Sequence, residues 1–222
     1  MNKWIMAGTA AAFTGAAAFA RSEYERTHLD VVHYDIKTDK LGLEWNGFKA
    51  VFLSDLHDNS FGMENEELLA AIEKEQPDIV LIGGDMLVVK EWAAPHFDML
   101  ANLYEKLVER YPVYYAFGNH EQRMKEEPLT YSGWWQSYWK VLKDSGMHVL
   151  VNKSEEIIKN GGTMRISGIT LPRECYRKGR IPSLSAGYLD QKLGKASDKN
   201  FELLLAHTPT FAKTYADWGA DL

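Results

Sequence analysis

The sequence contains a single cysteine, Cys175, among 222 residues. One cysteine excludes an internal disulfide and any zinc cluster built from several thiolates. No combination of histidine and acidic residue surrounds it as an activated nucleophile would require, so we expect an inert or buried thiol. Catalysis through a cysteine is therefore not indicated.

Positive charge is also in short supply, with 25 lysine and arginine residues against 31 aspartate and glutamate residues and a net charge of -6. Such a balance gives no broad electrostatic reason to bind nucleic acid or anionic lipid, and we expect no nucleic-acid binding. The acidic residues are instead available to hold cations.

Long apolar runs are scarce, and the one present covers residues 4–20. It is rich in alanine and falls slightly short of the ~20 residues that span a bilayer. Ala18-Phe19-Ala20 fits a signal cleavage site, so residues 1–26 are predicted to be a signal peptide or an N-terminal membrane anchor. Lys3 before the run favours an extracytoplasmic body, either exported or membrane-anchored. An ordinary amphipathic helix is the alternative, although no polar face recurs at helical spacing.

Residues 27–222 are predicted to form one α/β domain, because short apolar runs alternate with stretches of helical periodicity. The expected strands are 31–36, 48–53, 78–82, 113–117, 147–151, 164–169 and 201–206. The expected helices are 64–75, 96–110, 134–143 and 209–218. The same alternation would suit a Rossmann-like nucleotide-binding enzyme, but no G-x-G-x-x-G string follows a strand.

Polar residues come directly after four of the expected strands. They are Asp55 and His57, then Asp85, then Asn119 and His120, and finally His207. Ligands of open α/β sheets collect outside the carboxyl ends of the strands, so these side chains are expected to meet there. Each alone could be a turn cap or a loop residue, but four such blocks in order indicate a shared site.

These blocks, Ser54-Asp55-Leu56-His57, Gly84-Asp85, Gly118-Asn119-His120-Glu121 and Leu205-Ala206-His207, resemble the calcineurin-like metallophosphoesterase family, in particular its bacterial membrane-associated or exported phosphodiesterases. The resemblance implies an αββα sandwich built from β-α units. It also implies hydrolysis of a phosphomonoester or phosphodiester, with lipid-linked and nucleotide-like substrates both open.

The cofactor implied by the resemblance is a pair of divalent metal ions. Carboxylate, amide and imidazole ligands suit Mn, Fe, Zn or Co, and the sequence does not select among them. By resemblance, Asp85 would bridge the two ions, Asp55 and His57 would bind the first, and Asn119 and His207 the second. Two such ions can activate a water and stabilise charge on the phosphate.

The residues that follow Asn119 receive separate roles from the resemblance. His120 is expected to hydrogen-bond the scissile phosphate and protonate the leaving oxygen as general acid. Glu121 is expected to fix the histidine ring, with an exposed loop carboxylate as the alternative.

The family pattern ends with a Gly-His-x-His loop, and this sequence contains no such loop. We therefore expect a fragment that lacks the C-terminal strands of the fold, binds metal weakly and turns over slowly or not at all. A non-catalytic binding or scaffold protein that keeps the fold is the alternative function.

Two further groups of residues allow two interpretations each. The aromatic residues Trp134, Trp135, Tyr138 and Trp139 favour a packing helix over a lipid-facing cap. The basic residues Arg173, Arg177, Lys178 and Arg180 favour a solvated loop over a clamp for a phosphate or an anionic head group.

Overall fold

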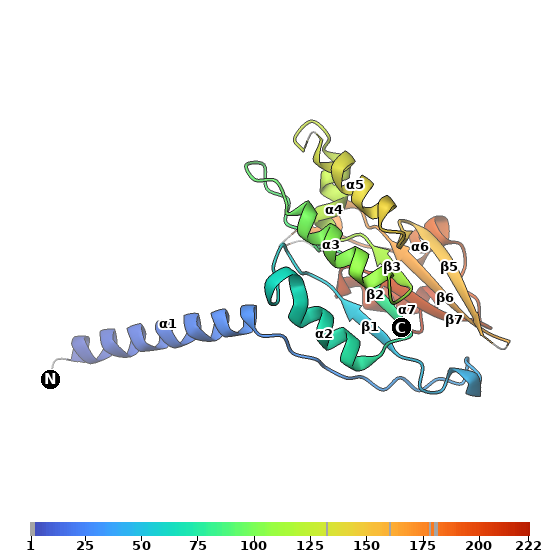
Figure 1. Cartoon of the computed structure of the whole chain (residues 1–222), viewed down its shortest axis with the longest axis horizontal. Helices are drawn as coiled ribbons and strands as arrows, with labels where there is room; N and C mark the ends of the chain where they lie inside the picture. Colours follow the sequence, from blue (N-terminus) through green and yellow to red (C-terminus); the bar gives the residue numbers. More distant parts are fainter. Residues whose placement is uncertain (1–2, 132, 160, 178, 180–181) are drawn as a thin grey trace.

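The computed structural model describes residues 3–131, 133–159, 161–177, 179 and 182–222, and these residues form two β-sheets (Figure 1). The first sheet is parallel, with the order β1 (Ala50–Leu53), β2 (Ile79–Ile82), β3 (Val113–Ala116) and β4 (His148–Leu150). In the second sheet, β6 pairs antiparallel with β5 and parallel with β7. Its strands are β5 (Lys153–Lys159), β6 (Gly162–Ile169) and β7 (Phe201–Ala206).

Helices cover the outer face of each sheet. The first sheet is covered by α2 (Glu66–Glu75), α3 (Phe97–Val108) and α5 (Trp134–Asp144). The second sheet is covered by α6 (Ala186–Leu193) and α7 (Ala212–Trp218). The resulting order of layers is α/β/β/α, which confirms the sandwich expected from the sequence.

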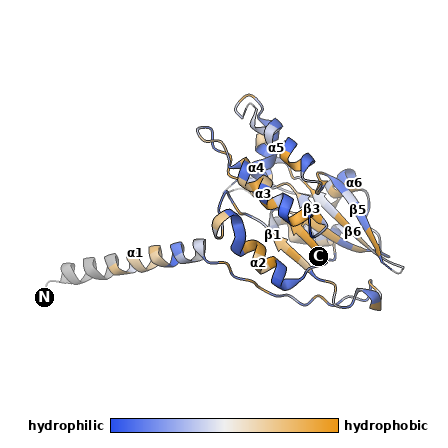
Figure 2. Ribbon diagram, viewed as in Figure 1, coloured by the Kyte–Doolittle hydropathy of each residue, from blue (hydrophilic) through white to orange (hydrophobic). Residues whose placement is uncertain are grey.

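The buried side chains of β2 show how the sequence specifies these layers. Successive residues of a strand point to opposite faces, so Val80 and Ile82 pack under the helices while Ile79 and Leu81 pack between the sheets. Both faces of β2 are buried, which explains why its sequence is apolar without interruption. Figure 2 shows the contrast with α2, which carries both hydrophobic and hydrophilic residues because only one of its faces is buried.

The aromatic residues of α5 pack against the core. Tyr138 is fully buried, and the rings of Trp135 and Trp139 lie edge-on to Phe117 with centroids 5.7 and 6.5 Å away. These contacts support the packing interpretation of the aromatic group. Cys175 is buried among α6 and α7, and burial raises the pKa of its thiol, which disfavours the reactive thiolate.

Two expectations about secondary structure are wrong. Residues 31–36 form no strand with any described residue, and Val32 and Tyr34 are exposed by 62% and 81%. Alternating apolar residues form a strand only if a partner strand is available, and none of the described strands pairs with this segment. The Gly118-Asn119-His120-Glu121 block was expected in a loop, but Asn119 is the first residue of α4 (Asn119–Glu126).

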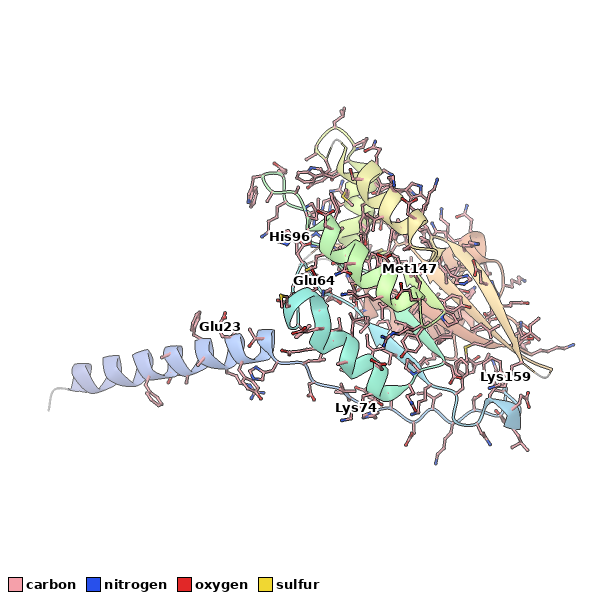
Figure 3. The ribbon with its side chains drawn as sticks, in the orientation of Figure 1. Glu23, Glu64, Lys74, His96, Met147 and Lys159 are labelled. Atoms are coloured by element: carbon pink, nitrogen blue, oxygen red, sulfur yellow. The ribbon has the colours of Figure 1, made fainter. Side chains whose placement is uncertain are left out.

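The sequence pattern also missed β5 and α6, which have no continuous apolar run. No residue of β5 is fully buried, because the strand lies at the edge of its sheet, and four of its seven residues are charged. Figure 3 shows Lys159 at the far end of this strand, where its ammonium group lies 5.8 Å from the centre of the Trp45 ring.

The N-terminal helix α1 (Lys3–Thr27) extends away from the two sheets (Figure 1). Among the described residues, no helix combines the length and the apolar character needed to cross a membrane. A signal or anchor role for residues 1–26 stays a prediction.

Candidate metal centre

Polar side chains from four segments meet at the carboxyl ends of the strands. Asp55 and His57 follow β1, Asp85 follows β2, and His207 follows β7. The fourth segment is the start of α4 after β3, with Asn119 and His120. The structure therefore brings together all six residues selected from the sequence.

Backbone hydrogen bonds hold the first two segments against each other. The N–H groups of Asp55 and His57 donate to the carbonyl oxygens of Gly84 and Asp85 at 3.0 and 3.1 Å. Asp55, His57 and Asp85 all have positive φ angles, of 57°, 53° and 51°. Such conformations cost on the order of 1–3 kcal/mol each and concentrate at functional sites, because the surrounding structure must enforce them.

Two glycines allow the second and third segments to approach closely. A Cβ atom on Gly84 would lie 1.9 Å from the backbone nitrogen of Gly118, and one on Gly118 would lie 2.2 Å from Asp85 Oδ1. Neither position has room for a side chain. The close approach of the Gly-Asp and Gly-Asn-His-Glu blocks therefore requires glycine at both positions.

Asp85 lies at the centre of the polar cluster and is almost completely buried. Its Oδ1 accepts the backbone N–H of His120 at 2.8 Å, while its Oδ2 is 3.4 Å from His57 Nε2 and 3.1 Å from His207 Nε2. Burial alone would raise the pKa of this carboxyl, but the hydrogen bonds from His207 and from the His120 backbone lower it. Asp85 is therefore an ionised carboxylate facing two imidazoles.

Two groups of ligand atoms share Asp85. One consists of His57, Asp85 and His120, the other of Asp55, Asp85 and His207, and within each the atoms lie no more than 4.8 Å apart. His57 Nε2 is also 3.4 Å from Asp55 Oδ1, so the pairing implied by the resemblance is compatible with this geometry as well. Ligands bound about 2.1 Å from one metal lie roughly 3 Å apart at right angles, close to these separations.

The amide of Asn119 lies against both Asp85 and His120. With its nitrogen toward Asp85, the amide donates to Asp85 Oδ2 at 3.3 Å and its oxygen accepts the His120 N–H at 3.2 Å. With the opposite orientation, the amide oxygen would face Asp85 Oδ2 and could bind a cation held by that carboxylate. The residues present therefore fit a site for hard or borderline divalent metals.

His207 is oriented for metal binding by its other ring nitrogen. Its Nδ1 lies 3.0 Å from the carbonyl oxygen of Gly83 and donates to it, which directs Nε2 at Asp85. Burial on its own lowers the pKa of His207, but the hydrogen bond and negative charge of Asp85 outweigh burial and raise the pKa to about 9. With no metal bound, His207 is therefore protonated on both ring nitrogens and positively charged at neutral pH.

Metal uptake is therefore expected to tighten as pH rises. A metal bound at Nε2 must displace the proton of His207, whose pKa of about 9 lies above neutrality. Release of one proton predicts an apparent Mn²⁺ affinity about tenfold higher at pH 8 than at pH 7. Calorimetric titration at the two pH values measures this, and His207→Gln should remove most of the difference. Equal affinities in the unsubstituted chain would contradict the assignment.

His120 is held with one ring nitrogen facing the polar cluster. Its Nδ1 accepts the backbone N–H of Val89 at 3.0 Å and lies 3.2 Å from the Arg123 guanidinium, so Nδ1 is the unprotonated nitrogen. The single ring proton then sits on Nε2, 3.9 Å from Asp85 Oδ2. Burial lowers the pKa of His120, and the Arg123 charge adds to this effect, which favours the neutral ring.

Glu121 does not fix the histidine ring and is not exposed, contrary to both expectations. It is completely buried, and its Oε2 accepts the backbone N–H groups of Asp85 and Gly118, each at 3.0 Å. Its Oε1 accepts from the Met86 N–H at 3.0 Å and the Tyr115 hydroxyl at 2.7 Å. Burial and the nearby charge of Asp85 raise the pKa of Glu121 to about 7.

A chain of buried hydroxyl groups continues from Glu121 into the helical layer. The Tyr115 hydroxyl lies 2.7 Å from that of Tyr138, which lies 2.8 Å from that of Tyr104. Glu121 therefore joins the loop after β2, the start of α4 and the core beneath α3 and α5.

Asp58 is a further organising residue that the sequence did not single out. Its two carboxylate oxygens accept the backbone N–H groups of Val88 and His96, at 2.8 and 3.2 Å. These bonds fix the long loop between β2 and α3 that also contacts His120. In the sequence, only the position of Asp58 directly after His57 indicates that it could belong to the site.

A cavity of about 360 Å³ lies beside Pro112, at the end of β3 opposite the polar cluster. A second cavity of about 230 Å³ is lined by Asn119 and lies next to the polar cluster. The ligand atoms therefore converge beside the smaller of these two cavities.

Comparison with known proteins gives consistent matches. The family model described as calcineurin-like phosphoesterase matches residues 48–222. The uncharacterized metallophosphoesterase YkoQ of Bacillus subtilis is 29% identical over 157 residues, which is 71% of this chain and 52% of the relative. The phosphodiesterase YaeI of Escherichia coli is 27% identical over 179 residues, which is 79% of this chain and 58% of the relative.

Among solved structures, phosphopantetheinyl hydrolase from Mycobacterium tuberculosis matches with a TM-score of 0.36 and 16% identity, covering 77% of this chain and 61% of that one. The chain spans between half and three fifths of the length of the two curated relatives.

Proposed function

Since this chain belongs to the calcineurin-like phosphoesterase family, we propose that it hydrolyses phosphate esters with divalent metal ions bound at the strand ends. The observation that carries the proposal is the position of Asp85 Oδ2, which lies 3.4 Å from His57 Nε2, 3.1 Å from His207 Nε2 and 3.3 Å from the Asn119 amide. One carboxylate surrounded in this way is suited to bridge two ions.

The ligands would divide between two ions, with Asp85 able to serve both. Asp55 and His57 would hold one, and Asn119 and His207 the other. When bound, the ions would supply an activated water and Lewis-acid stabilisation of the phosphate oxygens. The buried backbone contacts around Asp85 keep these side chains in place, so little reorganisation is needed on binding.

His120 would act on the substrate through its Nε2 proton. Val89 and Arg123 already donate hydrogen bonds to Nδ1, which disfavours a second proton on that nitrogen. A general acid at this position would need that doubly protonated imidazolium, so this role is disfavoured as well. We therefore propose that neutral His120 donates a hydrogen bond to the scissile phosphate and does not protonate the leaving oxygen, in contrast to the general-acid role expected from the sequence.

Replacing His120 with asparagine separates these two roles. Loss of one preorganised donor should lower kcat by about 10²- to 10³-fold. The loss should be similar for a 4-nitrophenyl and an ethyl leaving group, because neither depends on His120 for protonation. A much larger loss on the ethyl ester would restore the general-acid role.

The proposed activity is tested with bis(4-nitrophenyl) phosphate and the matching monoester in the presence of Mn²⁺. Hydrolysis that needs Mn²⁺ and stops with EDTA supports the proposal, and no hydrolysis at saturating metal opposes it. The name of the Escherichia coli relative favours diesters. Lipid-linked and nucleotide-like substrates both fall within the proposal.

A further inference from the structure

The cavity of about 230 Å³ beside Asn119 is rich in arginine. Its lining comes from α4 and from the 3-10 turn Arg173–Tyr176 with the residue that follows it. The lining residues are Asn119, Gln122, Arg123, Arg173, Tyr176 and Arg177. Because Asn119 belongs to both the cavity and the metal centre, the two sites are continuous.

The three arginines leave the cavity with excess positive charge. Arg173 forms an ion pair with Glu127. Within the part of the chain that the structure describes, neither Arg123 nor Arg177 has a carboxylate at ion-pair distance. Guanidinium groups bind phosphoryl oxygens well, because their N–H donors match the spacing of those oxygens. Lys178 and Arg180, selected with them from the sequence, lie outside the described residues.

Two buried polar atoms of the lining residues have no hydrogen-bond partner among the described residues. They are Gln122 Oε1 and the Tyr176 hydroxyl oxygen. Gln122 is 8% exposed, and its amide nitrogen donates to Glu126 at 2.8 Å, which leaves the oxygen free. Buried polar atoms without partners are rare in native structures, and a bound ligand is one explanation.

Tyr176 connects the cavity to the metal centre. Its ring centroid lies 6.2 Å from that of His207. A substrate held at the metals through its scissile phosphate could therefore place a neighbouring group against Tyr176 and the arginines. The hydroxyl can donate to an anion, while Gln122 Oε1 can accept from a substrate hydroxyl.

We propose that this cavity is a subsite for a second phosphoryl group of the substrate, bound by Arg123 and Arg177. The substrate class is then a phosphate ester that carries another phosphate a short linker away from the scissile one. The inference rests on the proposed function for the identity of the substrate, but the anion site itself exists without metal.

The first arm of the test therefore uses metal-free protein in EDTA, titrated with inorganic phosphate by calorimetry. Arg177→Gln should weaken binding roughly tenfold or more, because a charge-assisted hydrogen bond is lost. Arg177→Lys should retain part of the affinity. The matched control is Arg110→Gln, an exposed arginine paired with Glu73 near the other cavity, which should bind like the unsubstituted chain. Absence of phosphate binding, or equal binding by Arg177→Gln, would overturn the proposal.

The second arm uses Mn²⁺-loaded protein and two substrates without a free hydroxyl, 2-methoxyethyl 4-nitrophenyl phosphate and 2-(phosphonooxy)ethyl 4-nitrophenyl phosphate. The second phosphate should lower KM about tenfold, and Arg177→Gln should remove this advantage. Phosphate binding in the first arm without a KM advantage would show a site for free phosphate only and refute the substrate subsite. If no hydrolysis occurs, the proposed function fails while the first arm still decides the anion site.

Discussion

Replacing Asp85 with asparagine is expected to abolish Mn²⁺-dependent hydrolysis, with a loss of about 10³-fold or more. The substitution removes the negative charge that two ions would share, while the size and shape of the side chain stay nearly the same. The asparagine oxygen can still accept the His120 N–H that Asp85 Oδ1 accepts at 2.8 Å. The fold should therefore survive.

Hydrolysis rates and Mn²⁺ titrations of the variant measure this effect, and circular dichroism verifies folding. Asp98→Asn is a matched control, since this exposed carboxylate lies in the first turn of α3 and belongs to neither group of ligand atoms. The control should match the unsubstituted chain in activity and metal affinity. If Asp85→Asn binds Mn²⁺ and hydrolyses the diester normally, Asp85 is not the bridge.

Glu121→Gln is expected to cause the largest loss of stability, with the free energy of unfolding lowered by about 2–4 kcal/mol. Four donors converge on the carboxylate oxygens of Glu121, three of them backbone N–H groups that cannot rotate away. A glutamine places an NH₂ group against at least one of these N–H groups. Each buried donor left without an acceptor costs about 1–3 kcal/mol.

Thermal unfolding measures the effect, and for a chain of this length the loss corresponds to a fall in Tm of roughly 5–15 °C. Glu105→Gln, at an exposed position on α3, should change Tm by little. Since Glu121 holds the Asp85 backbone, Mn²⁺ affinity should fall in the folded variant as well. A Tm equal to that of the Glu105 variant would show that Glu121 does not organise the site.

The strands that carry the site were predictable because their sequences are apolar on both faces and end abruptly at polar residues. Ile79–Ile82 followed by Gly-Gly-Asp is such a case. In a parallel sheet the carboxyl ends of neighbouring strands share one edge, so order along the chain sufficed to place Asp55 and Asp85 together.

The contacts that the sequence did not reveal join distant segments. Glu121 is the last residue of a polar block, and only the approach of the loop after β2 makes it a buried acceptor. Arg123 and Arg177 are 54 positions apart and meet because the turn after β6 folds over α4. Local sequence patterns do not reveal which distant residues come into contact. The strand expected at 31–36 failed for the same reason, since a pattern does not reveal whether a partner strand exists.

Electron paramagnetic resonance of the Mn²⁺-loaded chain distinguishes two ions that share the carboxylate of Asp85 from ions that are bound separately. Two Mn²⁺ ions bridged by one carboxylate lie about 3.5–4 Å apart and are magnetically coupled. We predict a coupled spectrum that is lost in Asp85→Asn and unchanged in Asp98→Asn. A spectrum of isolated Mn²⁺ only, at saturating metal, would contradict the shared site and favour a binding or scaffold role that keeps the fold without the chemistry.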